Sequence, residues 1–245
     1  MKFFIFTSDR YVDIIADHAK LFNMMSGDKR LEITVLGFQP PTVEYPENFK
    51  FQSMGAQSDF PPKVWSEPIR KFIEGVEEKY FCYTWDDMFP ICEINFDLFD
   101  EAIELVESGQ AKRVGFFFGS DKQYRTSEPY NKNFNKLSQI APYRSAVEPG
   151  VWNKEYFLKH LHENMTPWDY EVKNMPAMTN DGAVQLTPRH TPIYGWVNMF
   201  RQGKFNDVMW NNYVSSPTGH FAWNTFQMLT PEVASIVETY KGRVA

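Results

Sequence analysis

Apolar runs of strand length alternate with segments of helical periodicity along the first half of this chain. The expected strands are residues 3–6, 31–38, 49–51, 80–85 and 112–118. Between them, apolar residues recur at three- and four-residue spacing after Ser8, after Ser66 and from about Asp97, which indicates helices. The resulting order β-α-β-β-α-β-α-β is typical of an α/β domain with a mostly parallel sheet flanked by helices.

The second half of the chain is less regular. Residues 152–162 are expected to form a helix capped by Asn153, with Phe157 and Leu161 on its apolar side. Residues 172–245 contain five prolines and only short apolar runs, so we expect short strands and loops there. A chain of 245 residues suits one domain with a large core.

Charge and cysteine content exclude several classes of protein. The net charge is −6 and no stripe of Lys or Arg is present, which disfavours a nucleic-acid partner. An anionic small ligand would then need a metal ion to supply positive charge. The two cysteines do not suggest a disulfide framework. No apolar stretch approaches the ~20 residues of a membrane span, and the N-terminal run is too short for a signal peptide. We expect a cytoplasmic protein without a transmembrane segment.

Asp86 and Asp87 are the most informative acidic residues, because they directly follow the aromatic strand at residues 80–85. Ligands of open α/β sheets bind beyond the carboxyl ends of strands, and hard divalent cations prefer oxygen ligands. Neighbouring strand residues point to opposite faces. We therefore expect Asp87 to bind a metal and Asp86 to face the ribose or sugar of a nucleotide ligand. Taken alone, the pair is more often a solvated turn or a helix cap.

A second acidic segment, Pro167-Trp168-Asp169-Tyr170-Glu171, places two carboxylates beside two aromatic rings. A carboxylate can act as a general base, and an aromatic ring can stack on a sugar. The segment is also compatible with a tryptophan buried under a short helix whose acids are exposed. Taken alone, that structural interpretation is favoured.

Histidines give a weaker indication of a metal site. His160 and His162 are two residues apart on an expected helix and so do not share a face. His190 and His220 lie in the loop-rich part, where either can add a metal ligand, although a lone histidine is more often structural.

Several catalytic motifs are absent from the sequence. It contains no GxGxxG after the first strand, and no GxxxxGK[ST], GxSxG or HExxH. Dehydrogenase, P-loop NTPase, α/β-hydrolase and zincin assignments therefore have no support.

The order and spacing of these segments resemble a family of small bacterial and phage glycosyltransferases of the GT-A type. The resemblance extends over roughly residues 1–206. The matching pieces are Thr7-Ser8-Asp9 at the end of the first strand, Trp65-Ser66, Trp85-Asp86-Asp87-Met88-Phe89, Trp152 with the helix after it, Pro167 to Glu171, and the aromatic segment 194–205.

The resemblance implies one GT-A domain over residues 1–245. Its nucleotide-sugar-binding half is residues 1–120, its acceptor-side half is residues 121–206, and a tail follows at residues 207–245. It also implies a Mn²⁺ or Mg²⁺ ion held by Asp87 and Asp86. The usual motif is Asp-x-Asp, whereas here the acids are adjacent, so which carboxylate contacts the metal stays open.

The resemblance further implies roles for individual residues. Trp168 and Tyr170 would contact the acceptor, and Glu171 or Asp169 would act as its base. The implied donor-binding residues are Thr7, Ser8, Asp9, Trp65, Ser66 and Asp86.

The expected reaction moves a sugar from a nucleoside-diphosphate sugar to a hydroxyl of a glycan or lipid-linked saccharide, with inversion or retention left open. One alternative is nucleotidyl transfer, which usually brings a glycine-rich, Lys/Arg-bearing loop that residues 8–12 lack. Another is a degenerate carbohydrate-binding protein on the same scaffold. The oligomeric state is not indicated.

Overall fold

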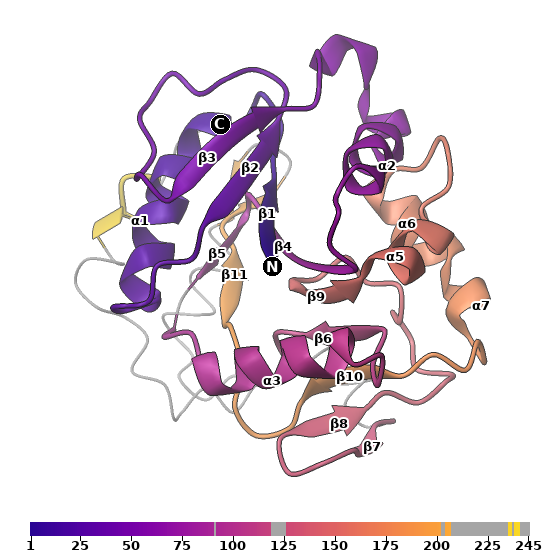
Figure 1. The fold of residues 1–245 in the computed structure, drawn as a ribbon. Coiled ribbons are helices and arrows are strands. Elements are labelled where there is room, and N and C mark those ends of the chain that lie inside the picture. The colour runs from indigo at the N-terminus through magenta and orange to yellow at the C-terminus, as the bar shows by residue number, and fades with distance from the viewer. Residues whose placement is uncertain (91, 119–125, 202–203, 207–234, 237, 241–245) are drawn as a thin grey trace.

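A nine-stranded sheet forms the centre of the protein, as seen in a computed structural model that describes residues 1–90, 92–118, 126–201, 204–206, 235–236 and 238–240 (Figure 1). The strand order is β3-β2-β1-β4-β9-β6-β10-β8-β7. These strands are β1 (Lys2–Phe6), β2 (Ile33–Gly37), β3 (Phe49–Ser53), β4 (Tyr80–Trp85), β6 (Arg113–Gly115), β7 (Glu128–Pro129), β8 (Phe134–Lys136), β9 (Gly150–Asn153) and β10 (Gln185–Pro188).

The sheet is mixed but mostly parallel. Strands β3, β2, β1 and β4 are parallel to one another, and β10 is parallel to β6. Strand β9 lies antiparallel between β4 and β6, and β8 and β7 add antiparallel pairs at one edge. The expected α/β architecture with a mostly parallel sheet is therefore confirmed.

Helices cover both faces of the sheet (Figure 1). One face carries α1 (Ile15–Met25) and α3 (Phe96–Glu107), and the other carries α2 (Ser66–Glu74), α5 (Lys154–His160) and α6 (Pro167–Lys173), which is followed by the short α7 (Met175–Met178). Strand alternation supplies both cores, because Phe3 and Ile5 pack toward α1 while Phe4 and Phe6 pack toward α2. No helix among the described residues has the length and apolar composition needed to cross a bilayer.

Two small antiparallel pairs lie outside the main sheet. Strand β5 (Met88–Pro90) pairs with β11 (Trp196–Asn198), and β12 (Phe200–Arg201) pairs with β13 (Lys204–Phe205). The first pair brings residues 196–198 beside the segment that follows β4.

The expected helix over residues 152–162 is partly wrong. Trp152 and Asn153 are the last residues of β9, where Trp152 lies between Phe81 of β4 and Arg113 of β6. The helix begins at Lys154, and the Asn153 side chain caps it by accepting the Tyr156 N–H at 3.0 Å. A strand of four residues directly before a helix leaves no periodic signal of its own, so the pattern assigned its last two residues to the helix.

A buried arginine joins several segments between residues 138 and 183. Arg144 is fully buried, and its guanidinium donates to the carbonyls of Met178, Ser138 and Ala183 at 2.8–3.1 Å. It also pairs with Asp181 at 3.1 Å. These contacts join the loop before β9 to the segment between α7 and β10.

We predict that Arg144→Met lowers the free energy of unfolding by about 3–5 kcal/mol, because it leaves the Asp181 carboxylate buried without its cation. Chemical denaturation at neutral pH measures the change. Arg10→Met, at an exposed position, is the matched control and should change stability by less than about 0.5 kcal/mol. Equal effects of the two variants would contradict the role of Arg144.

Candidate active site

The carboxyl ends of β1 and β4 meet at one edge of the sheet. Phe6 is opposite Trp85 in the parallel register, and the Asp86 N–H donates to the Phe6 carbonyl at 3.2 Å. Thr7 and Asp86 therefore follow their strands side by side. The edge is the one at which ligands of open α/β sheets bind.

Asp86 is a buried carboxylate held by Thr7. Its side chain belongs to a residue that is only 8% exposed, and the Thr7 hydroxyl donates to Oδ2 at 2.8 Å. Burial, followed by the neighbouring charge of Asp87, raises the pKa of Asp86 well above its usual range. The hydrogen bonds from Thr7 and from the backbone N–H groups of Ser8 and Asp87 oppose this rise.

Asp87 is more accessible, and it is positioned by the strand pair β5–β11. Asn198 of β11 donates Nδ2 to Asp87 Oδ2 at 3.0 Å, and the Met199 N–H donates to the Asp87 carbonyl at 2.8 Å. Burial raises the pKa of Asp87 as well, and the Asn198 bond lowers it. Asn198 was not expected from the sequence, because it lies 111 positions from Asp87 and only tertiary pairing brings the two together.

The acidic pair lacks a compensating cation within the described part of the chain. No Lys, Arg or His there forms an ion pair with Asp86 or Asp87, and no cluster of three or more His, Cys, Asp or Glu residues surrounds them. Two neighbouring carboxylates without a cationic partner among the described residues fit a hard divalent cation whose remaining ligands are other oxygen atoms.

The two histidines considered as additional ligands lie elsewhere or outside the described residues. His190 lines a separate cavity of about 290 Å³ with Asn95 and Asp97, at the start of α3. His220 falls outside the described ranges.

An aromatic pocket of about 230 Å³ opens beside Asp86. Two ring pairs line it, Phe38 with Phe60 at 6.1 Å between centroids and Trp65 with Trp85 at 5.6 Å. Four of the six residues expected to bind a donor also line it, namely Thr7, Ser8, Trp65 and Asp86. We call this cavity the aromatic pocket.

The other two expected donor residues, Asp9 and Ser66, support the walls of the pocket instead of lining it. Asp9 accepts the Gln39 N–H at 2.9 Å and donates its own N–H to Gln57 at 2.8 Å. Ser66 is fully buried, and its hydroxyl oxygen accepts the Met165 N–H at 3.1 Å. Phe38, Phe60 and Gln57 line the pocket and were not expected, because the short segments that carry them contain no motif.

The Pro167–Glu171 segment lies in α6, and its side chains have different surroundings. Asp169 closes a capping box with Thr166 and pairs with Lys173 at 2.8 Å, and the Lys173 contact is the main reason that its pKa falls to about 2. Trp168 is 73% exposed, whereas Tyr170 is fully buried against Trp65 and is not accessible to an acceptor.

Glu171 and Trp85 both form hydrogen bonds with the backbone of Val147, so Glu171 lies near the end of β4. Its Oε1 accepts the Val147 N–H at 3.1 Å, while the indole N–H of Trp85 donates to the Val147 carbonyl. Burial raises the pKa of Glu171, with the Val147 bond opposing and the charge of Glu148 adding to the rise. Glu148, beside Arg113 at 3.8 Å, is a further carboxylate here that no sequence motif indicated.

Comparisons with known proteins give a fold but no sequence relative. No protein-family profile and no curated protein sequence matches the chain. S. aureus TarS 1-349 superposes with a TM-score of 0.51 at 8% identity, covering 80% of this chain and 60% of TarS. Its complex with UDP-GlcNAc superposes with a TM-score of 0.50 at 10% identity, covering 84% of this chain and 60% of TarS.

Two other solved structures overlap less closely. The galactosyltransferase LgtC, in complex with donor and acceptor sugar analogues, gives a TM-score of 0.46 at 9% identity and covers 96% of this chain and 100% of its own. A cytidylyltransferase from Leptospira borgpetersenii gives a TM-score of 0.49 at 9% identity and covers 98% of this chain and 93% of its own.

The fold is thus α/β with GT-A glycosyltransferases as structural neighbours, as the sequence led us to expect. This chain spans about 60% of the length of the TarS chain that it matches.

We predict that Asp86→Asn stabilises the protein at alkaline pH when divalent cations are absent. The pKa of Asp86 is raised from 3.8 to about 8 on folding, so the folded state binds more protons than the unfolded state in that window. Stability therefore falls as pH rises through it. At pH about 9 the variant should be more stable by at least about 1 kcal/mol, since one pKa unit corresponds to about 1.4 kcal/mol.

Urea denaturation between pH 5 and pH 9, as an approximate working range, measures this dependence. Asp28→Asn, at an exposed position, is the control and should follow the wild type at each pH. A variant that is less stable than the wild type at the alkaline end would show that the Asp86 charge is compensated.

Proposed function

We propose that this protein is a glycosyltransferase that transfers a sugar from a nucleoside-diphosphate sugar to a hydroxyl acceptor. The observation that carries the proposal is the aromatic pocket, which opens directly beside an uncompensated acidic pair on a GT-A scaffold. The structural neighbour TarS is described with UDP-GlcNAc bound, which supports a donor of this class.

The aromatic pocket is the proposed site of the donor base and ribose. Its rings offer flat apolar faces for a heteroaromatic base, and Thr7, Ser8 and Asp86 offer hydrogen-bonding groups at one end. Asp86 lies where it can accept from a ribose or sugar hydroxyl. The pocket volume of about 230 Å³ suits a nucleoside and not the whole donor, so the diphosphate and sugar would extend toward Asp87.

Asp87 is the proposed ligand of a Mn²⁺ or Mg²⁺ ion, with Asp86 beside it. When bound, such an ion would offset the negative charge of the diphosphate leaving group. The protein's own contribution is to hold the Asp87 carboxylate in place through Asn198, and to place Asp86 against Thr7. The geometry favours Asp87 as the direct ligand, since fewer donors engage its carboxylate.

Glu171 is the proposed acceptor-side base. In an inverting reaction its carboxylate takes the proton of the acceptor hydroxyl. The acceptor oxygen then forms a bond to the anomeric carbon while the bond from that carbon to the diphosphate oxygen breaks, which releases the nucleoside diphosphate. A raised pKa suits this task, because a base works best near the operating pH. Asp169 is engaged by Thr166 and Lys173, which favours Glu171 over it.

The exposed ring of Trp168, on the same helix as Glu171, is the proposed contact for an acceptor sugar. A glycan and a lipid-linked saccharide both present such a sugar, and the ring does not distinguish them. Membership in the small bacterial and phage family stays a prediction.

Thermal denaturation with a panel of nucleoside-diphosphate sugars, with and without Mn²⁺, tests the donor site. A donor at 100 times its dissociation constant should stabilise the protein by about 2.7 kcal/mol. Asp87→Asn should remove the part of the shift that depends on Mn²⁺, whereas the exposed control Asp28→Asn should retain it.

Two outcomes separate the parts of this proposal. If no donor shifts the melting temperature with or without metal, the glycosyltransferase assignment is wrong. If a shift persists unchanged in Asp87→Asn, only the metal assignment is wrong. Product analysis addresses the alternative reaction, since sugar transfer releases a nucleoside diphosphate and nucleotidyl transfer releases pyrophosphate.

We predict that Glu171→Gln lowers kcat about 10²–10⁴-fold, the usual contribution of a general base. The variant should retain donor binding in the thermal assay, and its remaining activity should lose the acidic limb of the pH profile. Asp169→Asn is the matched control on the same helix and should keep that limb. A product of retained anomeric configuration would contradict the role of Glu171 as base.

A further inference from the structure

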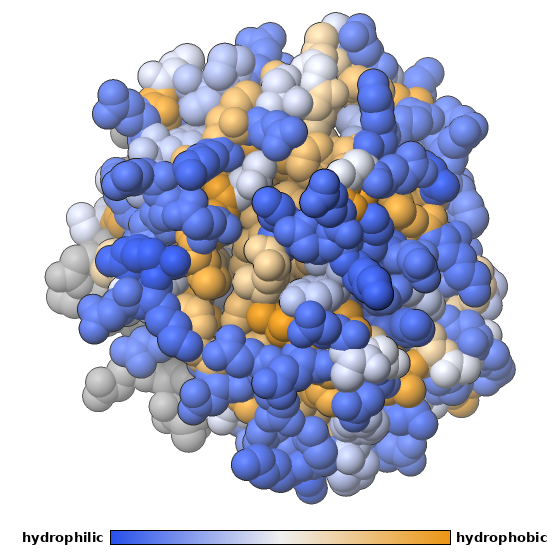
Figure 2. Space-filling view, in the orientation of Figure 1, coloured by the Kyte–Doolittle hydropathy of each residue, from blue (hydrophilic) through white to orange (hydrophobic). Residues whose placement is uncertain are grey.

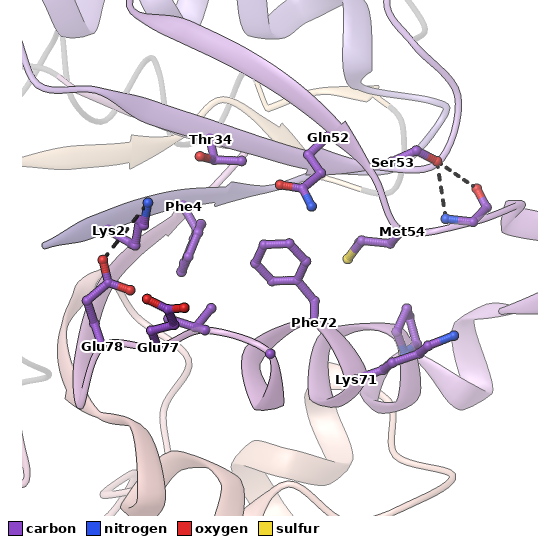
Figure 3. A pocket seen from close by; sticks show the side chains of 14 residues that line it. Lys2, Phe4, Thr34, Gln52, Ser53, Met54, Lys71, Phe72, Glu77 and Glu78 are labelled. Carbon is purple, nitrogen blue, oxygen red and sulfur yellow. Dashed lines mark hydrogen bonds and ion pairs between the residues drawn. The ribbon is translucent and has the colours of Figure 1, made fainter.

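A second and larger cavity lies between the sheet and α2. Its volume is about 760 Å³, within the range of roughly 300–1,000 Å³ that is usual for ligand sites. Thr34 and Gln52 line it from the strands, and Lys71 and Phe72 line it from α2 (Figure 3). We call it the strand–helix groove. Apart from Met54 and Pro68, none of its lining residues also lines the aromatic pocket.

The groove exists because α2 covers only part of its face of the sheet. Ile69 and Ile73 of α2 are buried with residues of β1 and β4 and with Leu36 of β2, which leaves Thr34 and Gln52 uncovered on this side. The sequence matches this exposure, since Thr34 and Gln52 are polar where Val35, on the opposite face, is buried under α1. Figure 2 shows a hollow band of moderately hydrophobic side chains here, with hydrophilic residues on both sides.

A peptide strand cannot extend the sheet at the floor of the groove. Strand β1 pairs with β2 and β4, and β2 pairs with β1 and β3, so the backbone groups of both are used within the sheet. Along β1 and β2 the groove therefore presents side chains and not a free strand edge.

Charge argues against an ionic polymer as the ligand. Two lysines and two glutamates line the groove, Lys2, Lys71, Glu77 and Glu78, and their formal charges cancel. Lys2 and Glu78 lie 3.9 Å apart. A nucleic acid or polyanion needs a surplus of positive charge, which the groove does not provide.

The remaining chemistry of the groove matches a sugar. The side chains of Thr34 and Gln52 form no hydrogen bond with any described residue, so their hydroxyl and amide groups are available. Across from them lies the half-buried ring of Phe72, held edge-to-face against Phe4 at 5.3 Å (Figure 3). Polar groups on one wall and an aromatic face on the other suit a ring with hydroxyls at its edge and C–H groups on its face.

The groove is continuous with the aromatic pocket. Met54 and Pro68 line both cavities. Phe4 lines the groove and Phe6 lines the aromatic pocket, and two residues on one strand are about 6.6 Å apart. A ligand in the groove would lie on the donor side of the acidic pair, away from Glu171 and Trp168 on α6.

We propose that the strand–helix groove is a second carbohydrate site, which binds a neutral oligosaccharide separately from the donor and the acceptor. Phe72 stacks on one sugar ring, and Thr34 and Gln52 bond to its hydroxyls. Binding at this site does not depend on the proposed transferase activity.

Methyl NMR titration tests the proposal with neutral hexasaccharides of glucose, galactose, mannose and N-acetylglucosamine as probes. At least one should bind in the millimolar range and shift the methyl signals of Met54 and Thr34. Phe72→Ala should weaken that binding about tenfold through lost stacking. Gln52→Ala, at an exposed position where folding is not at risk, should weaken it about threefold to tenfold.

Two control variants complete the test. Lys50→Ala changes an exposed residue of β3 that does not line the groove and should bind as the wild type. Trp168→Ala removes the exposed ring outside the groove and should leave the Met54 and Thr34 shifts in place. Binding that disappears in Trp168→Ala but persists in Phe72→Ala and Gln52→Ala overturns the proposal, as does a panel in which no hexasaccharide shifts these methyl signals.

Discussion

The parallel pairing of β1 with β4 is the contact on which the rest of the site depends. It places Phe6 opposite Trp85, so that the next residues, Thr7 and Asp86, leave the sheet side by side and form a hydrogen bond of 2.8 Å. The same pairing brings Trp85 next to the loops that carry the other rings of the aromatic pocket. A shift of the pairing register by one residue would turn every side chain of β1 to the opposite face and remove the pocket.

Keeping two adjacent carboxylates at this edge costs stability. Burial raises the pKa of both, the charge of Asp87 adds to the rise at Asp86, and no cation among the described residues offsets their charge. Packing elsewhere compensates, through two aromatic cores on the faces of the sheet and through Arg144 between β8 and β9. Local destabilisation supported by a well-packed scaffold is the usual signature of a functional site.

Strand β9 joins the two halves of the protein. It lies antiparallel between β4 and β6, so the residues before it reach past the carboxyl end of β4. Val147, three residues before β9, contacts both Trp85 and Glu171 and thereby links the end of β4 to α6. The position of Glu171 therefore depends on the segment before a strand whose last two residues, Trp152 and Asn153, the sequence pattern assigned to a helix.

The sequence by itself determined the alternating architecture, because apolar periodicity and length distinguish strands from helices locally. It gave β4 with the bounds observed, and it identified Asp86-Asp87 at the end of that strand. Only the tertiary structure decided which side chains converge. Asn198, Phe38 and Phe60 reach the site through contacts between distant segments. Tyr170 and Ser66 are fully buried and therefore cannot contact a ligand there. Local periodicity reports which face of an element is apolar, but the partner of that face is set by packing between segments far apart in the chain.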